Sequence, residues 1–73
     1  MGVPTLVQYS TYWLKETIFG KNSGENFGDG SKIVVLEIYE NTAKICRFGD
    51  YQNSCEVNLF ALQNKIDHER KIN

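Results

Sequence analysis

Apolar and polar residues alternate most clearly between residues 31 and 66. The first part of this region is rich in Val, Ile and Leu, a composition typical of a strand. The pair Glu40 and Asn41 predicts a tight hairpin turn, because Asn tolerates the left-handed backbone that such turns need. We therefore predict a three-stranded antiparallel meander that continues into a helical turn. The predicted elements are strands at residues 32–39, 42–48 and 54–59, a second turn at 49–53, a helical turn at 60–62 and a short last strand at 63–66.

The position of the first turn predicts the register of the hairpin, because strand side chains alternate between the two faces of a sheet. The expected pairs are Ile38 with Ala43, Leu36 with Ile45 and, on the opposite face, Glu37 with Lys44. One face of the meander is then almost entirely apolar and forms the predicted core. This face comprises Val34, Leu36, Ile38, Ala43 and Ile45, is continued by Cys55, Val57 and Leu59, and is closed by Leu62 and Ile66.

The opposite face of the same hairpin is less polar than a solvated surface. In this register Ile33, Val35, Cys46 and Phe48 lie on it together. One interpretation is that the sheet curls into a barrel and that the N-terminal segment, with Trp13, covers these residues. The other is that they form a contact surface for a partner or for a second copy of the chain.

The N-terminal part of the chain predicts strand more strongly than helix. Residues 5–19 are rich in β-branched and aromatic residues, which favours extended structure. Residues 12–19 also fit a short amphipathic helix, with Ser10 or Thr11 as its N-cap and Gly20 at its end.

Two segments lack a regular pattern. Residues 20–30 hold four glycines and predict a loop, which Phe27 would attach to the body of the domain. Residues 67–73 form a polar tail of mixed charge, typical of a solvated end.

The two cysteines, Cys46 and Cys55, are too few for a disulfide scaffold. A zinc site needs about four Cys, His or carboxylate ligands, and the only histidine, His68, lies in the polar tail. The predicted register places Cys55 opposite Ile45, so that Cys46 points to the other face. We therefore predict two reduced thiols, whereas a register shift of one residue would bring them opposite each other.

The order of these elements resembles an SH3-like small barrel, a fold of short strands with a tight hairpin and a helical turn before a final short strand. The resemblance covers residues 30–66 and rests on the runs GSKIVVL, AKICRF and VNLFAL. The chain also resembles the small peripheral SH3-like subunit of photosystem I in Gly30-Ser31-Lys32-Ile33, Tyr12-Trp13, Arg47-Phe48 and Leu59-Phe60-Ala61-Leu62. In this chain Tyr12-Trp13 precedes the Gly-Ser-Lys strand instead of following it, so the function of that subunit is not carried over. The acidic and aromatic long-loop signature of proline-rich-peptide-binding SH3 domains is absent.

Length and charge narrow the possible functions. The chain has 73 residues, which fits one domain over 1–73, and 8 Lys+Arg against 9 Asp+Glu give a net charge of -1. This balance argues against a dedicated DNA-binding domain. No stretch approaches the about 18 apolar residues of a membrane span, and no signal peptide is recognisable. We expect a cytoplasmic protein without membrane association.

The chain lacks the residue patterns of an enzyme. Gly20-Lys21-Asn22-Ser23-Gly24 has the residues of a phosphate-binding loop without their order or spacing. No base is expected near a Ser or Cys nucleophile, and exposed carboxylates such as Glu37 and Glu40 lack the burial that acid–base catalysis uses. We therefore predict a protein that is not an enzyme and has no cofactor and no metal.

Two functions fit these expectations. The first is a protein-binding module, adaptor or small subunit of a larger assembly, whose partner is another protein or a second copy of the chain. Its predicted partner-binding residues are Ile33, Val35, Phe48, Tyr51, Tyr39 and Arg47, since aromatic and Arg side chains contribute much of the energy of interfaces. The alternative is a small barrel that binds nucleic acid through Lys44, Arg47 and Tyr51, with bases stacked on the aromatic ring.

Overall fold

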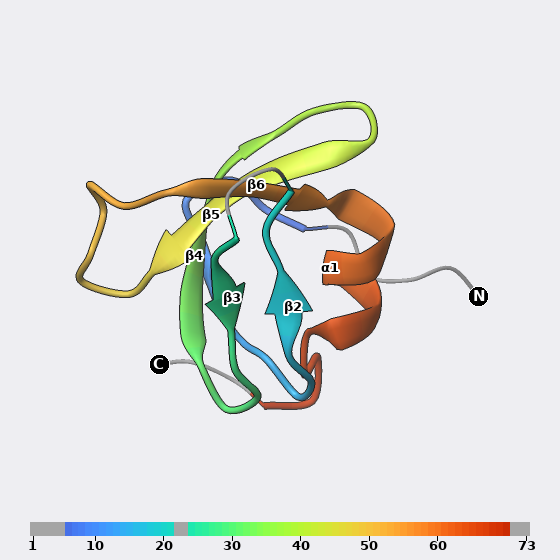
Figure 1. Ribbon diagram of the computed structural model, residues 1–73. Helices are drawn as coiled ribbons and strands as arrows, with labels where there is room; N and C mark the ends of the chain where they lie inside the picture. Colours follow the sequence, from blue (N-terminus) through green and yellow to red (C-terminus); the bar gives the residue numbers. More distant parts are fainter. Residues whose placement is uncertain (1–5, 22–23, 71–73) are drawn as a thin grey trace.

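Six short strands and one helix make up the described chain, which covers residues 6–21 and 24–70 in a computed structural model (Figure 1). The main sheet is antiparallel, with four strands in the order β1-β4-β5-β6, and a separate antiparallel pair is formed by β2 and β3. The chain is therefore mainly β, as predicted, but its described strands do not close into a barrel. The bounds are β1 Thr11–Trp13, β2 Ile18–Phe19, β3 Asn26–Phe27, β4 Lys32–Ile38, β5 Thr42–Arg47, β6 Cys55–Asn58 and α1 Leu59–Lys65.

The predicted meander is present as β4, β5 and β6. The backbone N–H of Tyr39 donates to the carbonyl of Thr42 at 2.8 Å, so Glu40 and Asn41 form the turn between β4 and β5 as expected. The predicted pairs at this end of the hairpin are confirmed, since Ile38 pairs with Ala43 and Glu37 with Lys44. Between β5 and β6, Ile45 pairs with Cys55, which also confirms the expected register.

A β-bulge in β4 changes the faces of the preceding residues. The register shifts between Val35 and Glu37, so that Leu36 is the extra residue and Val35, rather than Leu36, pairs with Ile45. A bulge places two residues of one strand opposite one of its partner, which reverses the alternation beyond it. The predicted core face is therefore wrong for this part of β4: Ile33 and Val35 are fully buried in the core, Val34 is turned to the opposite face, and Leu36 is partly exposed. Ile38, beyond the bulge, keeps its predicted pairing but is 38% exposed at the end of the hairpin.

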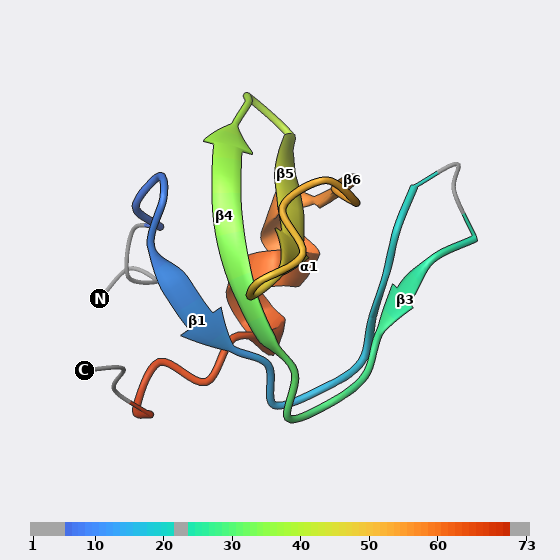
Figure 2. The same cartoon turned by 90° about the vertical axis from the view of Figure 1, so that its left-hand side faces the viewer.

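The N-terminal segment forms strands and not a helix. β1 pairs with β4, and β2 pairs with β3, so the strand interpretation of residues 5–19 is confirmed for Thr11–Trp13 and Ile18–Phe19 and the alternative helix is wrong. Residues 6–10 and 15–17 form no strand, and residue 5 lies outside the described residues. The region predicted as a loop, 20–30, contains β3 and forms the returning half of this second hairpin. Phe27 is only 1% exposed and attaches the hairpin to the core as predicted. Figure 2 shows the hairpin projecting from one side of the main sheet.

The C-terminal helix is longer than predicted. α1 covers the whole of Leu59–Lys65, so the expected last strand is wrong except for an isolated bridge between Ile66 and Leu14. The Asn58 side chain accepts a hydrogen bond from the backbone N–H of Ala61 at 2.9 Å and caps the helix. This cap satisfies one of the free N–H groups at the helix start. Leu62 and Ile66 are fully buried and close the end of the core, as expected.

The core lies between the inner face of the main sheet, the β2–β3 hairpin and α1. Residues from every element of the fold contribute apolar side chains to this single cluster, which is how so short a chain buries a core. Its fully or nearly fully buried members are Leu6, Leu14, Ile18, Phe27, Ile33, Val35, Ala43, Ile45, Cys55, Val57, Leu62 and Ile66.

Candidate protein-binding surface

The face of the main sheet directed away from the core carries a row of large side chains from β1, from β4 and from the residue that follows β5. Trp13 of β1 pairs with Lys32 of β4, and the backbone N–H of Phe48 donates to the Lys32 carbonyl at 2.9 Å. Ile33, the neighbour of Lys32, is buried on the core side. Because successive side chains in a strand point to opposite faces, Lys32 and Trp13 point outward.

The side chains of this row are in contact with each other. The Lys32 Nζ atom lies 5.5 Å from the centroid of the Trp13 ring and 4.1 Å from that of the Phe48 ring. Phe48 in turn contacts Tyr51 edge-to-face, with ring centroids 6.4 Å apart and an interplanar angle of 68°. Both of these rings are 53% exposed. A cation held over aromatic rings is favourable by about 0.5–1 kcal/mol at an exposed site.

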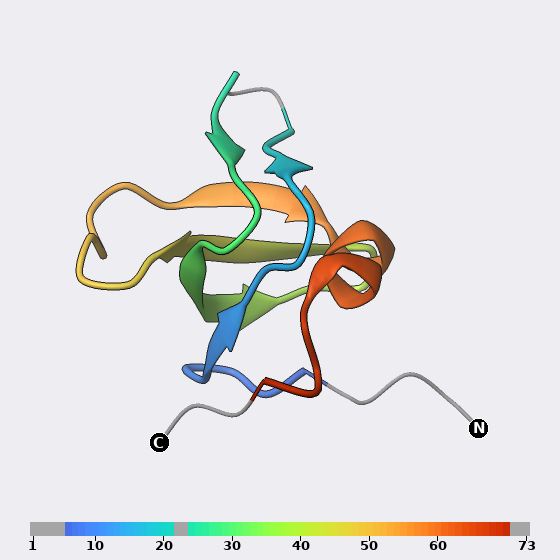
Figure 3. The same ribbon diagram turned by 90° about the horizontal axis from the view of Figure 1, so that it is seen from below.

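The C-terminal segment adds a second cation to this row. The Arg70 guanidinium carbon lies 3.7 Å from the centroid of the Trp13 ring. The segment is attached to β1 by a hydrogen bond of 2.8 Å from the backbone N–H of Asp67 to the Trp13 carbonyl. The Asp67 carboxylate accepts hydrogen bonds from the backbone N–H groups of Glu69 and Arg70. Figure 3 shows this segment, in dark red, close to β1, drawn in blue.

Within the predicted polar tail, Glu69 and Arg70 are exposed, and the exposed Arg70 packs on Trp13. Residues 71–73 lie outside the described residues. We call the set Trp13, Lys32, Phe48, Tyr51 and Arg70 the outer aromatic surface.

Of the predicted partner-binding residues, the structure brings Phe48 and Tyr51 together and separates the others from them. Ile33 and Val35 are fully buried, because the bulge in β4 turns them to the core. They are therefore not available on a surface. Tyr39 is 43% exposed but lies at the far end of the hairpin, beside the turn that joins β4 to β5.

Arg47 points to the core side of the sheet. Its guanidinium carbon lies 4.6 Å from the Phe27 ring centroid, and its Nη2 atom donates to the Asn26 carbonyl at 2.7 Å. Its Nη1 atom lies 3.6 Å from Oε2 of Glu25. These contacts hold the β2–β3 hairpin against the main sheet. Arg47 thus has a structural role and does not belong to the outer aromatic surface.

The three residues of the nucleic-acid alternative do not gather at one place. Lys44 and Arg47 are three residues apart in β5 and so point to opposite faces. Lys44 also forms an ion pair with Glu37, with 3.5 Å between Nζ and Oε2. Tyr51 contacts Phe48 instead of either cation.

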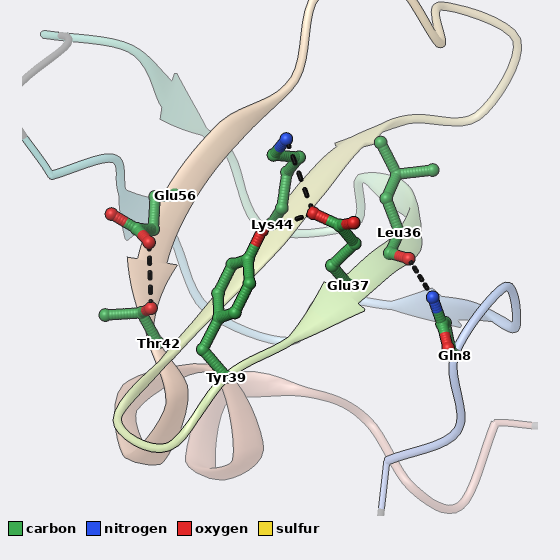
Figure 4. A network of polar contacts seen from close by, with 7 residues as sticks. All are labelled: Gln8, Leu36, Glu37, Tyr39, Thr42, Lys44 and Glu56. Atoms are coloured by element: carbon green, nitrogen blue, oxygen red, sulfur yellow. Dashed lines mark hydrogen bonds and ion pairs between the residues drawn. The ribbon is translucent and has the colours of Figure 1, made fainter.

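A polar network surrounds the β4–β5 hairpin (Figure 4). The Tyr39 hydroxyl donates to the Glu37 carboxylate, and Thr42 Oγ1 donates to Glu56 at 2.9 Å. The hydrogen bond from Tyr39, followed by the charge of Lys44, lowers the pKa of Glu37. The same hydrogen bond to Glu37 raises the pKa of Tyr39.

Both cysteines are buried and neither is joined in a disulfide, in agreement with the predicted reduced thiols. Cys46 pairs with Val34 on the side of the sheet opposite to Ile45. Burial, and then the nearby Asp50 carboxylate, raise the pKa of the Cys46 thiol. A raised pKa and burial make a thiol a poor nucleophile.

Sequence reasoning missed Lys32 and Arg70 as neighbours of Phe48, whereas one of its two interpretations already placed Trp13 over the face that holds Phe48. Trp13, Lys32 and Arg70 come from three separate segments, and only the pairing of β1 with β4 and the path of the C-terminal segment bring them together. The signals that indicated this surface were the apolar outer face that includes Phe48 and the aromatic side chains such as Tyr51.

Among residues 6–21 and 24–70, no three His, Cys, Asp or Glu side chains gather in a way that could hold a metal ion. In the same residues, no helix has the length and apolar character needed to cross a bilayer. Comparison with protein-family models, with curated proteins and with solved structures finds no match to this chain.

Proposed function

We propose that the chain is a non-enzymatic protein-binding module, or a small subunit of a larger assembly, that binds its partner on the outer aromatic surface. The observation that carries the proposal is the contact of Phe48 with Tyr51 on the outer face, with each ring half exposed. A small domain normally uses its large apolar residues for its core, as this chain does with Phe27. Aromatic side chains left at the surface in contact with each other are typical anchors of an interface.

We further propose a relationship to the SH3-like barrels. The order of elements supports it: a first strand, an excursion through the β2–β3 hairpin, the β4–β5–β6 meander, and the short helix α1. After α1 the chain returns to the first strand, where Ile66 bridges to Leu14. The relationship concerns the fold, and the partner is argued from the surface itself.

The proposal is tested by affinity capture from native extract with three versions of the chain. Phe48→Asp places a charge in the outer aromatic surface, whereas Phe60→Asp places one on α1, at a side chain that is similarly exposed at 59%. We expect a partner that binds the wild-type chain and Phe60→Asp but is lost with Phe48→Asp. Loss of an interface anchor costs more than about 1–2 kcal/mol, which is roughly tenfold or more in Kd.

Circular dichroism must show that both variants are folded. If Phe48→Asp unfolds, Phe48 has a structural role, and Tyr51→Ser, at the neighbouring exposed ring, takes its place in the test. The proposal is wrong if every captured protein binds the Phe48 and Phe60 variants equally.

A further inference from the structure

We infer that the segment recognised by the outer aromatic surface is acidic: a short peptide with one or two carboxylates beside a large apolar side chain. The inference rests on the proposed function and adds the chemistry of the partner. It follows from the two cations of the surface, Lys32 and Arg70, and from their surroundings.

Neither cation is neutralised within the described part of the chain. The ion pairs among these residues join Lys44 to Glu37 and Arg47 to Glu25. Lys32 instead lies over the rings of Trp13 and Phe48, and Arg70 lies over the ring of Trp13. An aromatic ring attracts a cation but leaves its N–H donors free on the solvent side. A partner carboxylate can therefore accept charge-assisted hydrogen bonds, which are about twice as strong as neutral ones.

The apolar part of the partner is indicated by Phe48 and Tyr51. Their edge-to-face arrangement leaves about half of each ring uncovered next to Lys32. A leucine or aromatic side chain on these rings would be desolvated while a neighbouring carboxylate reaches the ammonium group. The surface thus matches a residue pair of one acidic and one large apolar side chain.

Nucleic acid fits this surface less well. A single strand carries one phosphate per nucleotide, and proteins that bind it present a track of cations along its backbone. Among the described residues the outer aromatic surface offers two cations, Lys32 and Arg70, which fit one or two carboxylates of a peptide better than a row of phosphates.

A second copy of the chain also fits poorly. A twofold dimer places the same patch of both subunits face to face. On the outer aromatic surface this would bring the cations of one copy, Lys32 and Arg70, against the same cations of the other. An acidic segment of a different protein has the complementary charge.

The test is selection from a random peptide display library on the full wild-type chain. Binding of the selected peptides is then measured by the fluorescence of Trp13, the only tryptophan, which lies in the surface. We expect peptides in which Asp or Glu stands beside an aromatic or aliphatic residue. Replacing the carboxylates by amides, or Lys32 by Gln, should weaken binding about tenfold or more, as for a lost charge-assisted hydrogen bond. The matched control Lys21→Gln, at an exposed lysine beyond β2, should leave binding unchanged.

Each other outcome overturns a defined part of the inference. Peptides without acidic residues, bound equally by wild type and Lys32→Gln, would refute the acidic partner while the binding module stands. If Phe48→Asp binds every selected peptide as tightly as the wild-type chain does, the proposed function itself is refuted. Tighter binding of an oligothymidine strand, weakening steeply with salt, would replace the peptide by nucleic acid. Dimerisation in a concentration-dependent sizing experiment, abolished by Phe48→Asp, would replace it by a second copy.

Discussion

The guanidinium of Arg47 stacks on the ring of Phe27, with 4.6 Å between the guanidinium carbon and the ring centroid, and so joins the two sheets. The same group donates a hydrogen bond to the Asn26 carbonyl at 2.7 Å. Phe27 is the buried end of the β2–β3 hairpin. The hairpin is thus held by the buried side chain of Phe27 and by the Arg47 guanidinium that stacks on the Phe27 ring.

Replacing Arg47 by Met should therefore loosen the hairpin. Met keeps most of the length of the side chain but loses the cation–π contact and the hydrogen bond. We expect a loss of about 1–2 kcal/mol in the free energy of unfolding, measured by urea denaturation. Hydrogen exchange at the backbone N–H of Gly20, which donates to the Glu25 carbonyl across the hairpin, should accelerate.

The control for this experiment is Lys44→Met in the same strand. The ion pair of Lys44 with Glu37 is exposed to solvent, so Lys44→Met should lower the free energy of unfolding by less than Arg47→Met does. Equal stability of Arg47→Met and the wild type would show that Phe27 alone holds the hairpin.

The bulge at Leu36 is tested by comparing Val35→Ala with Leu36→Ala. Val35 is fully buried opposite Ile45, whereas Leu36 is partly exposed. Val35→Ala should lower the free energy of unfolding by about 2 kcal/mol, since it leaves a cavity in the core. Leu36→Ala should lower it by less, although it removes the larger side chain. Thermal or urea unfolding measures both. The reverse order of costs would indicate the regular register without a bulge.

The cap of α1 is tested at Asn58. Its Oδ1 atom accepts from the backbone N–H of Ala61 at 2.9 Å. Asn58→Ala should destabilise the chain by about 1 kcal/mol, and Asn58→Asp, which supplies a similar acceptor, should remain near the wild type. Equal losses of stability in both variants would show that the effect comes from the pairing of Asn58 with Thr42 across β5 and β6 and not from the cap.

The titration of Glu37 tests the polar network of the hairpin. Its pKa lies below the usual value of 4.5, because the Tyr39 hydroxyl and then Lys44 favour the carboxylate. Because the pKa of Glu37 is lowered in the folded state, the stabilisation from its ionised carboxylate is present above about pH 4.5 and is lost as the pH falls through the lowered pKa. The carboxyl carbon shift of Glu37 in NMR measures the midpoint.

Tyr39→Phe should raise this midpoint, since the hydrogen bond from Tyr39 is the largest single cause of the lowered pKa, and Lys44→Met should raise it as well. An unchanged midpoint in Tyr39→Phe would show that the hydrogen bond does not form in solution.

The candidate site could be predicted only in part. Phe48 and Tyr51 are three residues apart in the loop between β5 and β6, so their proximity follows from local structure. Lys32, Trp13 and Arg70 reach the same face from distant parts of the chain. Their juxtaposition depends on strand pairing and on the packing of the C-terminal segment, for which no local pattern exists.

The amino-acid pattern predicts the β4–β5–β6 meander, the turn at Glu40 and Asn41, and the pairing of Ile45 with Cys55, all of which are present. These features follow from alternation and turn chemistry, which act between neighbouring residues. The bulge at Leu36, and with it the face on which Val35 lies, depends on how the elements pack together. One extra residue reverses the alternation while leaving the local composition unchanged, so only the requirement to fill the core against the β2–β3 hairpin and α1 selects it.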